Sequence, residues 1–287
     1  MDGGIFMWHC ADLKNSAKQR LKPSYWKAFA VCLLSSIGMG GSLSATFSTS
    51  GFFIGDMDFG ELRMDEVTYE DIKEIGRHGL QSVKDMFAKI FGDFSQEQIR
   101  MFFIIFFAIM TVAFVISFAV KLFVGYPLLI GKSRFFVVNS KYDAPMNEVG
   151  FGFRSGSYMH FVGIIFWRQF KIFLWSLLLW IPGIIKSYEY SMVAYLLAEN
   201  PELTNEEAFR LSREFTRGEK WHLFVLDLSF LGWYLLGALC FGIGVLFVAP
   251  YHEAAVAEFY CLKREELFRN GVLSSAQLPG VERFATK

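Results

Sequence analysis

The stretch Met101-Phe-Phe-Ile-Ile-Phe-Phe-Ala-Ile-Met-Thr-Val-Ala-Phe-Val-Ile-Ser-Phe-Ala-Val-Lys-Leu-Phe-Val124 contains one charged side chain, Lys121, near its end. A bilayer core about 30 Å thick needs roughly 20 apolar helical residues to cross it. The stretch has this length and carries no polar face for water. It therefore predicts a transmembrane helix over residues 101–124.

The composition of the whole chain agrees with this prediction. Its 287 residues are 53% hydrophobic and include 33 Phe and 7 Trp, which is more apolar surface than an ordinary water-soluble domain carries. The 28 basic and 28 acidic side chains give zero net charge, so the total charge predicts no nucleic-acid partner. The four cysteines are far apart, and their spacing predicts neither a disulfide framework nor a metal site.

An earlier apolar run predicts another span. Residues 24–47 carry only Lys27 as a charge and begin with the interfacial pair Tyr25 and Trp26. Before this run, residues 11–21 place Leu, Ala and Leu on one helical face, and we expect this helix to lie on the membrane surface. Residues 48–99 between the two spans hold an excess of acidic side chains and are expected to form an extracytoplasmic insert.

Basic residues near the span ends predict the orientation of the chain. Five Lys or Arg residues precede or start the first span, and four follow the second: Lys132, Arg134, Lys141 and Arg154. Both flanks are therefore expected in the cytoplasm. Residues 1–287 are expected to form one polytopic domain with cytoplasmic amino and carboxy termini and a cytoplasmic tail over residues 263–287.

The carboxy-terminal half has two long apolar stretches, residues 161–198 and 221–260, each interrupted near its middle. Each is either one long span or a helical hairpin, and we favour hairpins because the breaks can then lie near water. The expected turn residues are Pro182 and Gly183 in the first hairpin and Gly242 and Gly244 in the second. The predicted fold is an all-α integral membrane bundle of six transmembrane helices in three hairpins, with four long spans as the alternative.

A surface helix is predicted between these two stretches. Thr204-Asn-Glu-Glu207 is a capping box, and it is followed by an apolar stripe of Ala208, Leu211 and Phe215. Basic side chains lie off this stripe at Arg210, Arg213, Arg217 and Lys220. The pattern is typical of an amphipathic helix at the cytoplasmic interface, ended by Gly218 and followed by an interfacial Trp221.

Ionisable side chains within apolar runs are the candidate functional residues. Asp227 has no basic residue three or four positions away, so its partner must come from another helix or from water; a packing role is favoured over a functional one. Glu189 follows Lys186 by three residues, and the two can neutralise one another. With neighbouring tyrosines they form either the wall of a polar cavity for a solute or lipid headgroup or, as we favour, a tyrosine belt with one ion pair.

His252 and Glu253 follow Pro250 in the last apolar stretch. Together with Asp227 and Glu189 they supply ligands for a divalent metal only if the hairpins converge, and no helix motif for a metal is present. Arg168 and Lys171 are expected to extend toward the headgroups. We predict no metal, no cofactor and no catalytic residue.

Several segments in order resemble a known family. They include Tyr188-Glu-Tyr-Ser-Met192, Asn200-Pro-Glu-Leu203, Leu226-Asp-Leu-Ser-Phe-Leu-Gly-Trp233 and Pro250-Tyr251. Over residues 160–262 the chain resembles the bacterial integral-membrane family called domain of unknown function 975. The resemblance implies a multi-span fold in a bacterial cell (inner) membrane. That family has no established activity, so the resemblance transfers no catalytic residue.

Absent catalytic motifs and abundant interfacial residues favour a non-enzymatic membrane scaffold or a lipid- or partner-interacting protein. Its basic surface helices would bind the anionic cytoplasmic leaflet. The expected partners are membrane lipids, together with a protein partner or a second copy of the chain. The alternatives are a small-solute transporter that uses buried carboxylates and an intramembrane enzyme that acts on lipid.

Overall fold

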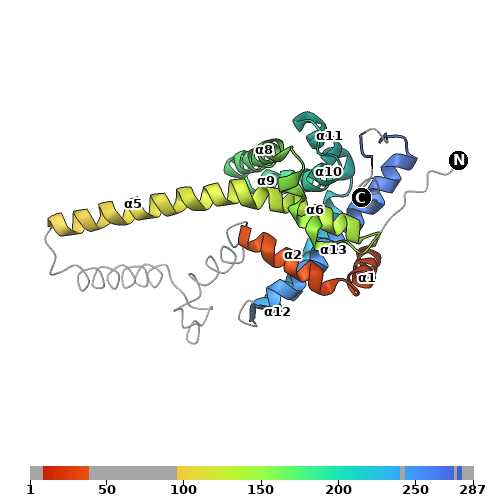
Figure 1. Ribbon diagram of the computed structural model, residues 1–287, viewed down its shortest axis with the longest axis horizontal. Helices are drawn as coiled ribbons and strands as arrows, with labels where there is room; N and C mark the ends of the chain where they lie inside the picture. The colour runs from red at the N-terminus through yellow and green to blue at the C-terminus, as the bar shows by residue number, and fades with distance from the viewer. Residues whose placement is uncertain (1–8, 39–95, 240–242, 275–276, 280–287) are drawn as a thin grey trace, which may run out of the picture. The chain divides into compact units, whose positions relative to one another are not determined.

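The structure is a computed structural model that describes residues 9–38, 96–239, 243–274 and 277–279. All regular secondary structure within these ranges is helical (Figure 1), so the predicted all-α class is confirmed for them. The chain divides into two units, one made of Met1–Ser44 and Ala119–Lys287 and the other of Ala45–Phe118. Each unit is described by itself.

The described part of the Ala45–Phe118 unit belongs to helix α5 (Gln96–Val120). Every side chain from residue 101 to residue 118 is exposed, although nearly all of them are apolar. A helix that is apolar on all sides has no face suited to water. The helix predicted over residues 101–124 is present as part of a 40-residue helical stretch, Arg100–Asn139.

In the larger unit this stretch continues as a π-helical turn, η2 (Lys121–Gly125), and helix α6 (Tyr126–Asn139). The wide π-helical turn precedes Pro127 and gives the proline ring the room that a regular α-helix lacks. Nearly every residue of α6 is buried. Helix α6 lies at the centre of the unit because it packs against α2, α8, α10 and α13.

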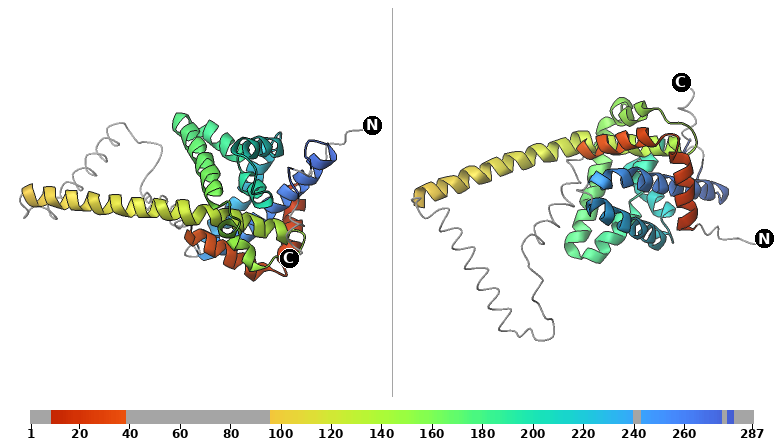
Figure 2. Two further views of the ribbon diagram at one scale, coloured as in Figure 1. Left: turned by 45° about the horizontal axis from the view of Figure 1, so that its top comes forward. Right: turned by 90° about the horizontal axis from the view of Figure 1, so that it is seen from below.

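The amino-terminal helices pack on the same core. Helix α1 (Cys10–Leu21) buries Leu13, Ala17 and Leu21, the face that the sequence predicted, and it packs against α13 (Figure 2). Helix α2 (Tyr25–Gly38) is the described part of the span predicted over residues 24–47. Residues 39–47, and the predicted insert up to residue 95, lie outside the described residues.

Two pairs of consecutive helices pack side by side where hairpins were predicted. Helix α8 (Tyr158–Leu178) packs against α9 (Trp180–Glu189), and α12 (Lys220–Leu239) packs against α13 (Ile243–Arg269). Three helical stretches among the described residues are long and apolar enough to cross a membrane: Arg100–Asn139, Tyr158–Leu178 and Lys220–Leu239. The predicted arrangement of six spans is not confirmed.

The break in the first pair differs from the predicted one. It lies at Leu179, whose backbone is extended (φ −157°, ψ 139°), while Pro182 and Gly183 lie inside α9. Proline is tolerated there because the first turn of a helix needs no N–H donor. Gly183 instead permits close packing, since an added Cβ would collide with Ser176 of α8.

In the second pair, Gly242 lies outside the described residues, and Gly244 lies in the first turn of α13. A Cβ at Gly244 would collide with the backbone of Gly237 in α12. The remaining helices are short and join these pairs to the core: η3 (Met146–Gly150), α7 (Phe151–Arg154), α10 (Val193–Glu199) and α11 (Asn205–Phe215).

Candidate functional site

Helix α11 begins with the predicted capping box. The Thr204 hydroxyl accepts a hydrogen bond from the Glu207 backbone N–H, and the Glu207 carboxylate accepts one from the Thr204 N–H at 3.0 Å. The Thr204 hydroxyl also donates to the Glu207 carboxylate at 2.7 Å, and this bond, together with the one from the Thr204 N–H, holds the pKa of Glu207 below its usual value. Ala208, Leu211 and Phe215 are buried, as predicted. The basic side chains of α11 are therefore left on its outer side.

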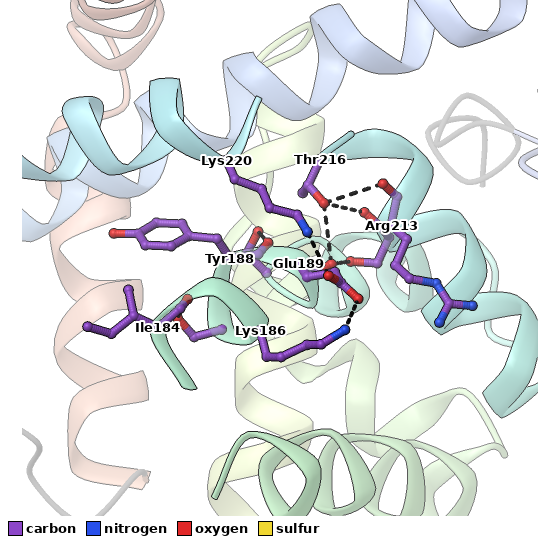
Figure 3. A network of polar contacts seen from close by, with 10 residues as sticks. Ile184, Lys186, Tyr188, Glu189, Arg213, Thr216 and Lys220 are labelled. Atoms are coloured by element: carbon purple, nitrogen blue, oxygen red, sulfur yellow. Dashed lines mark hydrogen bonds and ion pairs between the residues drawn. The ribbon is translucent and has the colours of Figure 1, made fainter. Parts of the chain in front are cut away.

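Glu189, at the end of α9, joins three helices (Figure 3). Its carboxylate accepts hydrogen bonds from Lys186 at 2.7 Å and from Lys220 of α12 at 2.6 Å, and its backbone carbonyl accepts one from Ser212 of α11 at 2.8 Å. Burial alone raises the pKa of Glu189, but the two lysines outweigh burial and lower it. The Lys186–Glu189 pair predicted from the sequence spacing is present, and Lys220 is an addition from another helix.

Arg213 lines two open pockets. The first, about 520 Å³, is lined by Glu189, Arg213, Glu214, Arg217, Gly218, Lys220 and Trp221. The second, about 610 Å³, is lined by Trp167, Lys171, Thr204, Asn205, Glu206, Glu207, Phe209, Arg210 and Arg213. In Figure 3 the Arg213 guanidinium points away from Glu189. Within the described part of the chain Arg213 makes no ion pair.

Cations of α8 and α9 lie over aromatic rings close to these pockets. The Lys171 ammonium is 4.0 Å from the centroid of the Phe209 ring in α11, and the Lys186 ammonium is 5.6 Å from that of Trp175. Each contact adds a cation–π attraction that holds the ammonium in place, and Lys186 also pairs with the Glu189 carboxylate.

Asp227 connects three helices in a chain of polar side chains. Its carboxylate accepts a hydrogen bond from the Tyr188 hydroxyl of α9 at 2.7 Å and is 2.9 Å from Nε2 of His252 in α13. Nδ1 of His252 in turn lies 3.2 Å from the Tyr234 hydroxyl. The partners of Asp227 thus come from other helices, as the sequence required.

Glu253 belongs to a separate pair. Its carboxylate lies 2.6 Å from the Lys132 ammonium of α6 and 3.4 Å from the Tyr195 hydroxyl. Glu253 and His252 are neighbours in sequence but bind different partners. The structure therefore distributes the candidate residues over three clusters, and among the described residues no group of three or more His, Cys, Asp or Glu is placed to hold a metal ion.

Arg168 is a residue whose position the sequence analysis missed. It lies on α8 next to the buried positions Ile164 and Ile165, and its Nε is enclosed without a hydrogen-bond partner in the described chain. Only the buried i, i+3 and i+4 pattern of α8 indicates that this arginine turns inward instead of toward the headgroups.

Comparison with known proteins identifies one family. The model of a family described as a protein of unknown function (DUF975) matches residues 82–265, a longer segment than residues 160–262, which carry the resemblance in the sequence. No curated protein and no solved structure matches the chain.

Proposed function

Because the chain belongs to the DUF975 family of proteins of unknown function, its relatives supply no activity, and we propose from its geometry that it is a membrane-embedded scaffold that binds anionic lipid headgroups beside α11. The observation that carries this proposal is the pocket of about 520 Å³ in which Arg213, Arg217 and Lys220 meet Trp221. Phosphate and carboxylate groups are the ligands that such cations prefer.

The membrane location rests on apolar side chains that would otherwise face water. Large hydrophobic residues are exposed along α5, the end of α8, the start of α9 and much of α12. Exposing apolar area to water costs about 25 cal/mol per Å², and patches this extensive mark lipid or partner contacts. Lipid acyl chains would cover these surfaces, with the hairpins α8–α9 and α12–α13 entering the bilayer.

The pocket beside α11 has the features of a headgroup site at the membrane surface. Trp221 is 68% exposed, and tryptophan concentrates at the membrane interface. Glu189 is already neutralised by two lysines. Arg217 only contacts Glu214 at 3.4 Å, with its side chain largely exposed, which is a weak pairing. The pocket therefore offers positive charge to an anionic lipid.

The distribution of basic residues supports the cytoplasmic side for this surface. Basic residues in short loops favour the cytoplasmic side of a membrane. Helix α11 and the turn after it carry Arg210, Arg213 and Arg217, and Lys220 begins α12. We propose that both termini and α11 lie in the cytoplasm and that the membrane is the inner membrane of a bacterium.

Native mass spectrometry of the full chain from nanodiscs tests the headgroup site. We expect wild type to retain phosphatidylglycerol over phosphatidylcholine from an equal mixture. The double variant Arg213→Gln/Arg217→Gln should lose this preference by roughly 10- to 30-fold, at about 1 kcal/mol for each basic residue. Arg269→Gln removes a charge at the end of α13, outside the pocket, and serves as control. An unchanged preference in the double variant would refute the proposal.

A solute carrier is the second candidate, and the observation in its favour is the chain from Tyr188 through Asp227 and His252 to Tyr234. A titratable pair bridging helices is typical of proton-coupled carriers. Proteoliposomes with an internal pH dye measure proton entry when solute mixtures are added. The carrier hypothesis requires Asp227→Asn to abolish solute-dependent entry while the variant keeps wild-type abundance; equal loss of abundance would make Asp227 a packing residue.

A further inference from the structure

The tip of the α8–α9 hairpin contains no charged residue. Residues 172–185 read Ile-Phe-Leu-Trp-Ser-Leu-Leu-Leu-Trp-Ile-Pro-Gly-Ile-Ile and are bounded by Lys171 on α8 and Lys186 on α9. Helices α8 and α9 pack against one another, so Lys171 and Lys186 bound the apolar tip on its two arms. They mark the level at which both helices leave the polar part of the unit.

This level is fixed by contacts to α11. Lys171 lies over the Phe209 ring of α11, and Lys186 binds Glu189, whose carbonyl accepts the hydrogen bond from Ser212 of α11. Helix α11 itself carries exposed Arg210 and Glu206 and is therefore placed in water or among headgroups. Neither lysine can move deeper into a bilayer without breaking these contacts.

The hairpin beyond the lysines is short. An α-helix rises 1.5 Å per residue, so α8 extends about 10 Å from Lys171 to Leu178 and α9 about 9 Å from Trp180 to Lys186. The hydrocarbon core is about 30 Å thick. Even with several ångströms added by lysine side chains that reach back to the headgroups, the tip arrives near the bilayer centre. By contrast, α12 extends about 28 Å from Lys220 to Leu239.

The chemistry of the tip suits hydrocarbon and not a second interface. Leu177, Leu178 and Ile181 are at least 70% exposed. Leu179 breaks the helix, but its N–H donates to the Trp175 carbonyl at 3.1 Å and its own carbonyl accepts from the Gly183 N–H at 3.2 Å. These two bonds satisfy the Leu179 N–H and carbonyl, as a break inside hydrocarbon requires, whereas a turn at the far headgroups usually carries polar residues.

We propose that α8–α9 is a re-entrant hairpin that enters the leaflet on the α11 side, reaches the bilayer centre and returns without crossing. Its partner is the acyl-chain layer of that leaflet. The inference rests on the proposed membrane location of the bundle. Helix α8 is long and apolar enough to cross a membrane. Its first half packs inside the protein, however, where Phe161, Val162, Ile164 and Ile165 are buried, so only its second half enters the leaflet.

Depth measurement on the full chain in proteoliposomes tests this inference. The four native cysteines are replaced by alanine, and single cysteines are placed at the hairpin tips as Leu179→Cys or Ile181→Cys and, for comparison, Leu239→Cys. A bimane fluorophore on each cysteine is quenched with phosphatidylcholine that carries a nitroxide either at acyl position 12 or on the headgroup. We expect acyl quenching to exceed headgroup quenching at least twofold at the α8–α9 tip, with the reverse ratio at Leu239→Cys.

Labelling with a membrane-impermeant maleimide gives the second readout. The inference expects protection of Leu179→Cys and Ile181→Cys from both sides of the membrane, and labelling of Leu239→Cys from the side opposite α11. Headgroup quenching and far-side labelling at both α8–α9 positions would overturn it and make α8 a full span. If no position is quenched by either nitroxide lipid, the proposed membrane location itself fails.

Discussion

Glu189 shows how a buried carboxylate is kept charged. Its two lysine partners hold its folded pKa below the usual value of 4.5. The unfolded chain therefore binds a proton at a higher pH than the folded chain does. The contribution of Glu189 to stability is present above about pH 4.5 and is lost as the pH falls through the folded pKa.

This linkage gives a prediction for Glu189→Gln. We expect the variant to have a lower melting temperature than wild type at pH 7 and a smaller loss of melting temperature between pH 5 and pH 3, because its amide does not titrate. Differential scanning fluorimetry in detergent measures both. Glu202→Gln, at an exposed position, is the control and should follow wild type. A constant offset between the Glu189→Gln and wild-type melting temperatures at every pH would contradict this role of Glu189.

Arg168 and Lys132 are half-buried cations, and we expect opposite effects on stability when each is replaced. Lys132→Met leaves the Glu253 carboxylate without its 2.6 Å partner, which should cost about 3–5 kcal/mol. Arg168→Met removes a charge for which the described residues hold no carboxylate partner, so its melting temperature should equal or exceed that of wild type. Thermal unfolding in one detergent compares them. Equal losses in both variants would show that Arg168 has an anionic partner.

At the residue scale, the sequence predicted pairs within one helix better than pairs between helices. The spacing of Lys186 and Glu189 predicted their ion pair, because residues three apart on a helix are neighbours. The sequence indicated that Asp227 needs a partner from another helix, because no basic residue lies three or four positions away. It did not indicate His252, because that pairing depends on how α12 and α13 pack. The pairing of Glu253 with Lys132 joins residues 121 positions apart, and no local pattern reveals it.

At the scale of elements, close packing of α12 on α13 depends on two glycines. A Cβ at Gly237 would collide with the Gly244 and Val245 backbone, whereas one at Gly232 on the same helix meets nothing. We expect Gly237→Ala to lose about 1–3 kcal/mol through overpacking and Gly232→Ala to be neutral or slightly stabilising. Thermal unfolding in detergent measures both variants, and similar stability of the two would contradict this packing.

Elements with strong local signals were predicted well. The buried faces of α1 and α11 and the capping box follow from 3.6-residue periodicity and from the preference of Thr and Glu for a helix start. The break in the first hairpin was predicted at Pro182 and Gly183 but lies at Leu179. Proline is typical of turns, yet it is tolerated in the first turn of α9. Leu179, which breaks the helix, carries no turn signal of its own.

At the scale of the whole molecule, the larger unit separates two kinds of surface. Ion pairs and capping groups gather around α10, α11 and the end of α13, as in the Arg264–Glu199 pair at 2.7 Å. Exposed leucine and isoleucine gather on the α8–α9 tip and on α12. The composition predicted a membrane protein, but it did not indicate where the membrane–water interface crosses the helices. In the sequence, α8 has the pattern of one continuous apolar span, and only the packing of the helices indicates where that interface would lie.

Spin-label accessibility of the full chain in nanodiscs tests the membrane account most directly, with one nitroxide at Leu235 on the exposed side of α12 and another at Arg210 on α11. Power saturation compares collisions with oxygen, which concentrates in lipid, and with a water-soluble nickel complex. We expect the label at position 235 to collide mainly with oxygen and the label at position 210 mainly with nickel. Nickel access at Leu235 as high as at Arg210 would contradict a membrane-embedded bundle with α11 at its surface.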